Sequence, residues 1–382
     1  MSGNVLRLVC TATVVAAVLA GGPAVAVPAP EPEPLAGEPS VAELLTDLQD
    51  LYRKAEDATE SYNATAEKLK AQKAETRRLG RALSKARLAL GASRGAAGRL
   101  ARQQYQDTSE LSPYVRLLLA RDPQHALDQG HLIRRAAAER AQTVGRLTAG
   151  ERRAKELAAK SRKALDKQLT LAEKRKKKRD TVTRRLAEVE RLLADLSAEQ
   201  LSQLRELEES ETARAQEELV ASGALGSPAP RAPSRAGKAA LRYAVDQIGK
   251  PYEWGAEGPA TYDCSGLTSR AWTRAGRAIP RTSQEQWAEL PRVPLETVRP
   301  GDLVVYFPEA THVALYLGDG MVVHAPRPGA KVKVSPIAAN PLLGVVRPDS
   351  GASPMAGYVP PELPEGATEG SDLGYGEVGA PG

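Results

Sequence analysis

The sequence predicts a long antiparallel α-helical coiled-coil hairpin followed by a small α+β domain at the C-terminus. At 382 residues the chain is long enough for more than one folding unit. Apolar residues recur at heptad spacing over two long stretches that lack proline. Aromatic residues make up only 4% of the chain, yet Trp254, Trp272, Trp287 and Phe307 all fall in one later stretch, which is therefore the best candidate for a compact core.

The N-terminus has the pattern of a cleavable signal peptide over residues 1–26. Arg7 precedes a short apolar run, LVCTATVVAAVLAGG, and small residues end at Ala26, where we expect cleavage. The run is too short for a typical membrane-spanning helix. Cys10 would leave with the signal, so the secreted chain would hold a single cysteine, Cys264.

The hairpin is predicted over residues 41–222, after a Pro-rich tether at 27–40. No proline interrupts 41–107 or 124–222, and the prolines between these stretches predict a helical tip. Alanine is frequent along the seams, which predicts close but weak packing. The seam residues step by four and three along both helices: Val41, Leu45, Leu48, Tyr52, Ala55, Thr59 and Tyr62, then Val182, Leu186, Val189, Leu193 and Leu196.

The net charge of +6 is compatible with nucleic acid or with an anionic cell surface as partner. Predicted export argues against nucleic acid. The basic run KRKKKR at 174–179 is most simply a solvated helix face, and contact with anionic wall polymers or lipid head groups is the alternative.

A Pro/Gly linker at 223–236 separates the hairpin from the predicted globular domain at 237–349. Within this domain Asp263 has the position of an N-cap and Cys264 that of the first helical residue. A thiol at a helix N-terminus is favoured as the reactive thiolate, whereas the simpler alternative is a small buried apolar side chain.

Three β-type segments follow, and His312 and His324 lie on the second and third of them. A cysteine nucleophile needs a base and a polar group that orients the base. We predict that residues 318–320 form a three-residue loop, which places Ala314 opposite His324. Both histidines then lie on one face of the hairpin as diagonal neighbours.

Six ordered motifs, PYEWG, DCSGL, PRTS, GDLVVY, HVALYLG and VHAP, resemble the NlpC/P60 family of papain-like cell-wall endopeptidases. They lie within about a third of the chain. The helical hairpin before such a domain also resembles secreted coiled-coil wall hydrolases of division and growth. The family commonly has a second glycine where this chain has Ala256, a difference that we expect to affect only the loop.

The resemblance implies a cysteine-type peptidase in which Cys264 is the nucleophile, His312 the base and His324 the orienting residue. The implied substrate is a peptidoglycan stem peptide, cut between D-glutamate and the diamino acid, without a cofactor or metal. The implied substrate-binding residues are Tyr252, Asp263, Arg281 and Ser283. Simpler interpretations are a packing role for Tyr252 and a surface charge for Arg281.

Two other functions remain open at this stage. Cys264, His312 and His324 also have the chemistry of a zinc site. A non-enzymatic wall-binding scaffold or division regulator is the other alternative. The helices have no role in a cysteine site, so we expect them to restrain the cleft until a membrane-bound division or transport complex releases it, or to act as a passive spacer. The Gly-, Pro- and Glu-rich tail at 350–382 is predicted to be disordered.

Overall fold

The computed structural model describes residues 39–107, 115, 118, 122–226, 231–370 and 372. The predicted signal peptide, nearly all of the tether, most of the helical tip and part of the linker lie outside these residues. The described residues from Val41 onward belong to one compact unit. Its helical part comprises α1 (Val41–Asp107), α3 (Pro123–Ala194) and α4 (Ala198–Ala221).

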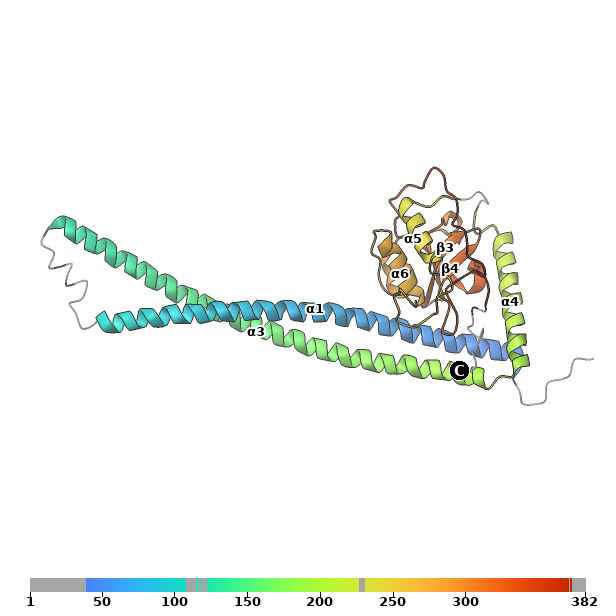
Figure 1. Ribbon diagram of the computed structural model, residues 1–382, viewed down its shortest axis with the longest axis horizontal. Coiled ribbons are helices and arrows are strands. Elements are labelled where there is room, and N and C mark those ends of the chain that lie inside the picture. The colour runs from blue at the N-terminus through green and yellow to red at the C-terminus, as the bar shows by residue number, and fades with distance from the viewer. Residues whose placement is uncertain are drawn as a thin grey trace, which may run out of the picture. The chain divides into compact units, whose positions relative to one another are not determined.

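Helices α1 and α3 lie side by side and antiparallel, as predicted (Figure 1). Gln72 donates to the Ala164 carbonyl at 3.0 Å, and Arg94 pairs with Glu151 at 3.0 Å, so residue numbers rise along one helix as they fall along the other. Among the described residues, no helix is both long and apolar enough to cross a membrane.

The second predicted arm is not continuous, because the chain breaks between α3 and α4. Ser197 caps α4: its hydroxyl accepts from the Gln200 N–H, and the Gln200 side chain accepts from the Ser197 N–H. A capping box starts a new helix without proline or glycine. The lack of these breaking residues therefore led to the incorrect prediction of one continuous helix. Leu48 of α1 and Leu204 of α4 are fully buried in a cluster at the junction.

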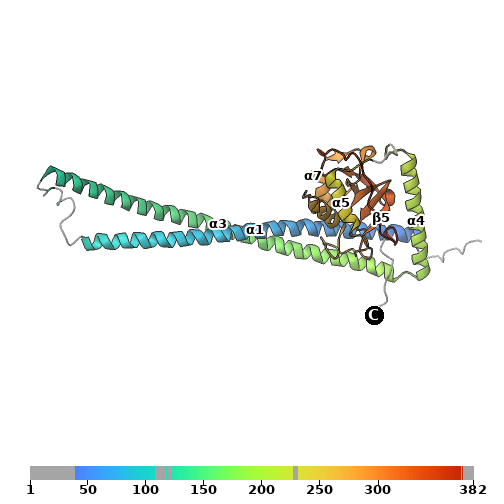
Figure 2. The ribbon, with the colours of Figure 1, turned by 45° about the horizontal axis from the view of Figure 1, so that its top comes forward.

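The C-terminal domain is an antiparallel six-stranded sheet with the strand order β1-β6-β2-β3-β4-β5. Helices α5 and α6 cover one face of the sheet. The end of α4 lies beside the domain (Figure 2), and its Leu219 packs against the core on the other face of the sheet. This is the predicted α+β fold. Its elements are α5 (Arg235–Val245), α6 (Cys264–Arg274), α7 (Ser283–Glu289), β1 (Arg292–Val293), η1 (Leu295–Thr297), β2 (Leu303–Tyr306), β3 (His312–Gly318), β4 (Met321–His324), β5 (Lys333–Pro336), η2 (Ile337–Ala339) and β6 (Leu342–Val346).

The β3–β4 hairpin has the register that the sequence predicts. Leu315 lies opposite Val323, which continues to the predicted pairing of Ala314 with His324. The turn differs in detail. Asp319 and Gly320 form a two-residue turn with positive φ, and an irregularity between residues 316 and 318 supplies the extra residue.

The C-terminal tail differs from the predicted disorder over residues 350–370, which pack on the domain. The Met355 N–H donates to the Pro233 carbonyl at 2.9 Å, and Ala367 is only 4% exposed within the core. A Gly- and Pro-rich segment has low hydrophobicity, but here backbone hydrogen bonds and a few apolar side chains hold it to the surface. Residues 373–382 lie outside the described part.

Candidate active site

Cys264 begins α6, and Asp263 caps this helix as predicted. The Asp263 Oδ1 accepts from the Gly266 N–H at 2.6 Å. The Cys264 side chain is 3% exposed, and the backbone of Val313 on β3 is close enough to act on its pKa. The nucleophile candidate therefore lies against the strand that begins with His312.

The two histidines form the first link of a buried hydrogen-bonded chain. His312 Nε2 lies 2.9 Å from His324 Nδ1, and His324 Nε2 lies 3.0 Å from the hydroxyl of Ser335. That hydroxyl donates to Asp372 at 2.8 Å.

The carboxylate of Asp372 determines the donor and acceptor of each hydrogen bond in this chain. Because Ser335 donates to Asp372, its oxygen is left to accept from His324 Nε2–H. His324 Nδ1 then accepts from His312 Nε2–H, which leaves the Nδ1 lone pair of His312 able to accept a proton.

Asp372 was not among the predicted site residues. Lys333 lies 3.0 Å from its carboxylate. Burial alone raises the pKa of Asp372, but the contacts with His324 and Lys333 outweigh it and hold this pKa well below the ordinary value. No local pattern marks an aspartate in a Gly-rich tail, so only the fold places it beside the histidines.

Helix α1 covers the candidate nucleophile through Glu60. Glu60 Oε1 accepts from the Ser265 hydroxyl at 2.6 Å and lies 4.0 Å from the Cys264 sulfur. Glu60 Oε2 accepts from the Ser283 N–H at 2.9 Å. The side chain of Glu60 thus lies directly beside the thiol.

Other residues of α1 contact both sides of the site. Glu56 Oε1 lies 3.5 Å from His312 Nδ1, the nitrogen that would accept the proton. Asn63 donates to Asp263 at 3.0 Å, and Tyr62 packs edge-on against Trp254 with ring centroids 5.1 Å apart. We refer to this arrangement, with α1 on the site, as the docked conformation.

The electrostatics of the docked conformation disfavour an ion pair between thiolate and imidazolium. Burial raises the pKa of Cys264 well above its ordinary value, and the charges of Glu60, Asp263 and Glu56 act in the same direction. Burial also lowers the pKa of His312 well below its ordinary value. The predicted effect of the helix N-terminus is therefore outweighed while α1 is docked.

The two α1 carboxyls are themselves strongly perturbed. Burial raises the pKa of Glu60 to about 8, and the neighbouring charge of Asp263 adds to this rise. Burial raises the pKa of Glu56 to about 7, while the charge of Arg327 opposes the rise.

The predicted substrate-binding residues lie together around Cys264. Arg281 is 9% exposed, pairs with Asp263 at 2.8 Å and donates to the Ser265 hydroxyl at 2.8 Å, so it is not a surface charge. Tyr252 is 9% exposed, and burial, with a smaller contribution from the charge of Cys264, raises its pKa well above the ordinary value. The Ser283 hydroxyl is buried without a partner among the described residues.

Asp263 has mostly scaffolding contacts in the docked conformation. Besides capping α6 and pairing with Arg281, it accepts from the Gly255 N–H at 2.9 Å. Sequence reasoning did not single out Ser265 or Glu60 as site residues. Over the described part of the chain, no group of three or more histidine, cysteine, aspartate or glutamate residues is arranged to hold a metal ion.

The fold and the site define an antiparallel α+β domain with a helix-borne thiol beside a two-histidine hairpin. Residues 249–343 match the model of the NlpC/P60 family. The chain therefore has an NlpC/P60 family domain in its C-terminal part.

Matches to similar proteins cover about a quarter of the chain. "Probable endopeptidase Cgl2188" of Corynebacterium glutamicum is 48% identical over 89 residues, which cover 23% of this chain and 43% of that protein. "Probable endopeptidase Rv2190c" of Mycobacterium tuberculosis is 37% identical over 102 residues, which cover 27% of this chain and 26% of that protein. The chain thus spans less than half of the length of these relatives. The solved NlpC/p60 domain of peptidoglycan hydrolase SagA is 32% identical, with 29% of this chain and 97% of that chain covered and a TM-score of 0.28.

Proposed function

We propose that this protein is a secreted endopeptidase that hydrolyses a peptidoglycan stem peptide by cysteine catalysis. The observation that carries the proposal is the buried set of Cys264 on α6 and His312 on β3, with His324, Ser335 and Asp372 behind the base. The relatives named as probable endopeptidases support the same class of activity.

In the proposed reaction, His312 Nδ1 takes the thiol proton and the Cys264 sulfur attacks the amide carbonyl. The imidazolium then gives this proton to the leaving amine as the carbon–nitrogen bond breaks, which leaves a thioester on Cys264. Water, deprotonated by the same imidazole, hydrolyses the thioester and restores the thiol. Over the whole cycle one water molecule is consumed: its hydroxyl stays on the acyl product, and its proton replaces the thiol proton that left with the amine, so the step balances without a cofactor.

The contacts of Glu60 support a substrate that carries a free carboxylate near the scissile bond. The Ser265 hydroxyl and the Ser283 N–H already bind the carboxyl group of Glu60 there, and Arg281 supplies positive charge. A glutamate that is linked through its side-chain carboxyl retains a free α-carboxylate beside the bond. A D-glutamyl to diamino acid amide fits this requirement.

The docked conformation supports restraint by the helical hairpin, which we include in the proposal. Glu60 and Glu56 lie beside Cys264 and His312, and burial together with the charges of the two glutamates raises the pKa of Cys264. Release by a membrane-bound division or transport complex that contacts the hairpin would expose the site. The signal peptide predicted at 1–26 supports a location outside the cell, at the wall.

Digestion of purified peptidoglycan with the wild-type chain and with Cys264→Ala, followed by mass analysis of the fragments, tests the activity. The wild type should release peptides ending at the cut amide, and Cys264→Ala should release none. Identical products would refute the enzyme and favour the non-enzymatic wall-binding scaffold. The masses also identify the bond.

A further inference from the structure

Five cations form one row along α3. They are separated by seven, seven, four and seven residues, and each interval is close to a whole number of helical turns, so the side chains lie on the same side of the helix. With the rise of an α-helix, the row extends about 37 Å along the axis. We call it the basic row, and its members are Lys160, Lys167, Lys174, Lys178 and Arg185.

The four lysines of the basic row have no counterion in the described part of the chain. None of them takes part in an ion pair or a side-chain hydrogen bond there. Lys160, Lys167 and Lys174 are exposed, and Lys178 is half-buried. The row therefore presents four uncompensated charges to an anion from outside the protein.

Acidic residues of the same stretch lie on another side of α3. Asp166, Glu173 and Asp180 are also seven residues apart, and the first two directly precede a lysine of the basic row. One residue along an α-helix corresponds to a rotation of about 100°. Glu173 pairs with Lys177 at 3.2 Å, and Asp180 pairs with Arg179 at 2.9 Å. The mixed charges of an ordinary solvated face thus lie beside the basic row, which contains no acid between its ends.

The basic run at 174–179 is not a single patch. Only Lys174 and Lys178 of this run belong to the basic row. Arg175 lies over the ring of Tyr62 and donates to its hydroxyl at 2.7 Å. The row begins at Lys160, fourteen residues before the run, so the run in the sequence marks neither the direction of the row nor its length.

The C-terminal end of the basic row lies beside the C-terminal domain. Lys178 and Arg185 line a cavity of about 280 Å³ together with Glu309 and Thr311 of the domain. Arg185 also pairs with Glu188 at 2.8 Å. Because the domain borders this end of the row, it keeps a flat surface such as a membrane from Lys178, whereas a narrow chain can enter. The charged residues of α1 that line the same cavity are Arg53, Lys54 and Asp57.

The other end of the row extends further along the hairpin. Gln72 of α1 donates to the Ala164 carbonyl at 3.0 Å, which places these two residues side by side. Lys70 of α1, which lines a cavity with the domain, precedes Gln72. The helices are antiparallel, so Lys160 lies beyond this cavity and is exposed to solvent.

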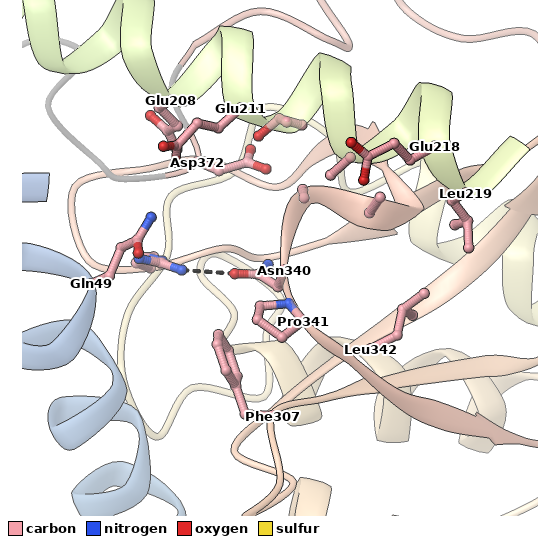
Figure 3. A pocket seen from close by; sticks show the side chains of 15 residues that line it. Gln49, Glu208, Glu211, Glu218, Leu219, Phe307, Asn340, Pro341, Leu342 and Asp372 are labelled. Atoms are coloured by element: carbon pink, nitrogen blue, oxygen red, sulfur yellow. Dashed lines mark hydrogen bonds between the residues drawn. The ribbon is translucent and has the colours of Figure 1, made fainter. Parts of the chain in front are cut away.

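A second cavity of the domain has a charge that disfavours a polyanion. It has a volume of about 520 Å³ and lies between α4 and the residues before β6 (Figure 3). Its charged lining residues are four carboxylates and one arginine, namely Glu208, Glu211, Glu218, Asp372 and Arg327. An anionic chain is therefore repelled there and attracted to the side of α3 that carries the basic row.

We propose that the basic row binds a linear phosphate polymer and holds the protein along it. The lysine ammonium is a compact point charge that pairs with phosphate without a fixed geometry. Successive cations of the row are about 6 to 10 Å apart along the axis, so several phosphates of one chain are neutralised at the same time. A phosphodiester polymer of the cell wall has this chemistry. The proposal involves neither Cys264 nor His312, so it is independent of the proposed peptidase function.

The test measures binding of the full chain to long-chain inorganic polyphosphate over a range of salt concentrations. The affinity of the wild type should fall steeply with salt, because each lysine that pairs with a phosphate releases a counterion. Lys160→Gln/Lys167→Gln/Lys174→Gln should weaken binding roughly tenfold or more. It should also make the slope of log affinity against log salt shallower by about 2, which is three contacts at about 0.7 each.

The matched control removes three exposed cations from other sides of α3. Lys155→Gln/Arg162→Gln/Lys176→Gln changes the net charge by the same amount, and none of these residues belongs to the basic row. It should weaken binding by roughly twofold at most, because salt screens charges that do not touch the polymer. All six substituted positions are exposed, so both triple variants should keep the melting temperature of the wild type.

Orthophosphate and vesicles of phosphatidylglycerol distinguish the possible sources of phosphate. Orthophosphate at the same phosphate concentration and ionic strength should not displace polyphosphate, since it links no two cations. Its displacement of polyphosphate would overturn the proposal, as would a wild type that does not bind polyphosphate or equal weakening by the two triple variants. Vesicles that bind more tightly than polyphosphate through the same lysines would assign the row to a membrane instead.

Discussion

Replacing Glu60 with glutamine should remove a pH-dependent release of α1. In the docked conformation burial raises the pKa of Glu60 from 4.5 to about 8, with Asp263 acting in the same direction and Ser265, Arg281 and Ser283 opposing. The docked form therefore binds this proton more tightly than the released form. Docking is fully favoured below about pH 4.5 and weakens progressively as the pH rises to about 8.

The size of this effect follows from the two pKa values. A change from 4.5 to about 8 corresponds to at most about 5 kcal/mol of docking free energy lost between acid and alkaline pH. Glu56, with its pKa raised to about 7, adds a loss of the same sign. Glutamine keeps the shape of the protonated side chain and one accepting oxygen, and it cannot ionise, so Glu60→Gln should stay docked at pH 8.

The assay is the rate of peptidoglycan turnover from pH 5 to 9 for the wild type, Glu60→Gln and an exposed control, Glu190→Gln. The wild type and the control should gain activity steeply towards pH 8, and Glu60→Gln should be slower there by roughly tenfold or more. Superimposable profiles for the wild type and Glu60→Gln would refute the role of this carboxyl.

Three further outcomes follow from the packing. Removing the chain from Ser350 onward should lower the melting temperature by about 5 °C or more, because buried tail contacts are lost; an unchanged melting curve would show that the tail does not pack. Asp372→Asn should lower kcat by roughly tenfold with little change in KM, since the orienting chain loses its charge; an unchanged kcat would remove Asp372 from this chain. Tyr62→Ala should raise turnover about fivefold by deleting the contact with Trp254, whereas the exposed Tyr105→Ala should not. Equal rates for the two tyrosine variants would show that this contact does not hold α1 down.

Local chemistry made part of the site predictable. An aspartate directly before Cys264 is a helix N-cap signal, and the structure has that cap. The spacing of His312 and His324 around a turn limits the register to a few choices, of which one brings both rings to the same face. Such features depend on neighbours within a few residues.

The heptad periodicity of the helices could not predict which of their carboxyls become buried against residues distant in the sequence. Glu56 and Glu60 lie next to the heptad seam and have the pattern of ordinary solvated charges, yet they are 4% and 1% exposed. The donors that offset the burial of the Glu60 carboxyl, the Ser265 hydroxyl and the Ser283 N–H, lie more than 200 residues away in the sequence. The role of Asp372 could not be identified from the sequence for the same reason. Its partners lie on β4 and β5, while its own segment has the composition of a disordered tail.

The mechanism is tested most directly by the rate at which the full chain cleaves purified peptidoglycan when α1 is displaced. Glu56→Arg/Glu60→Arg should place two positive charges against Arg281 and Arg327 and undock α1, so turnover should rise roughly tenfold or more over the wild type. The same pair of substitutions combined with Cys264→Ala should give no turnover. A rate equal to that of the wild type would contradict the restraint, and turnover that survives Cys264→Ala would contradict the cysteine mechanism itself.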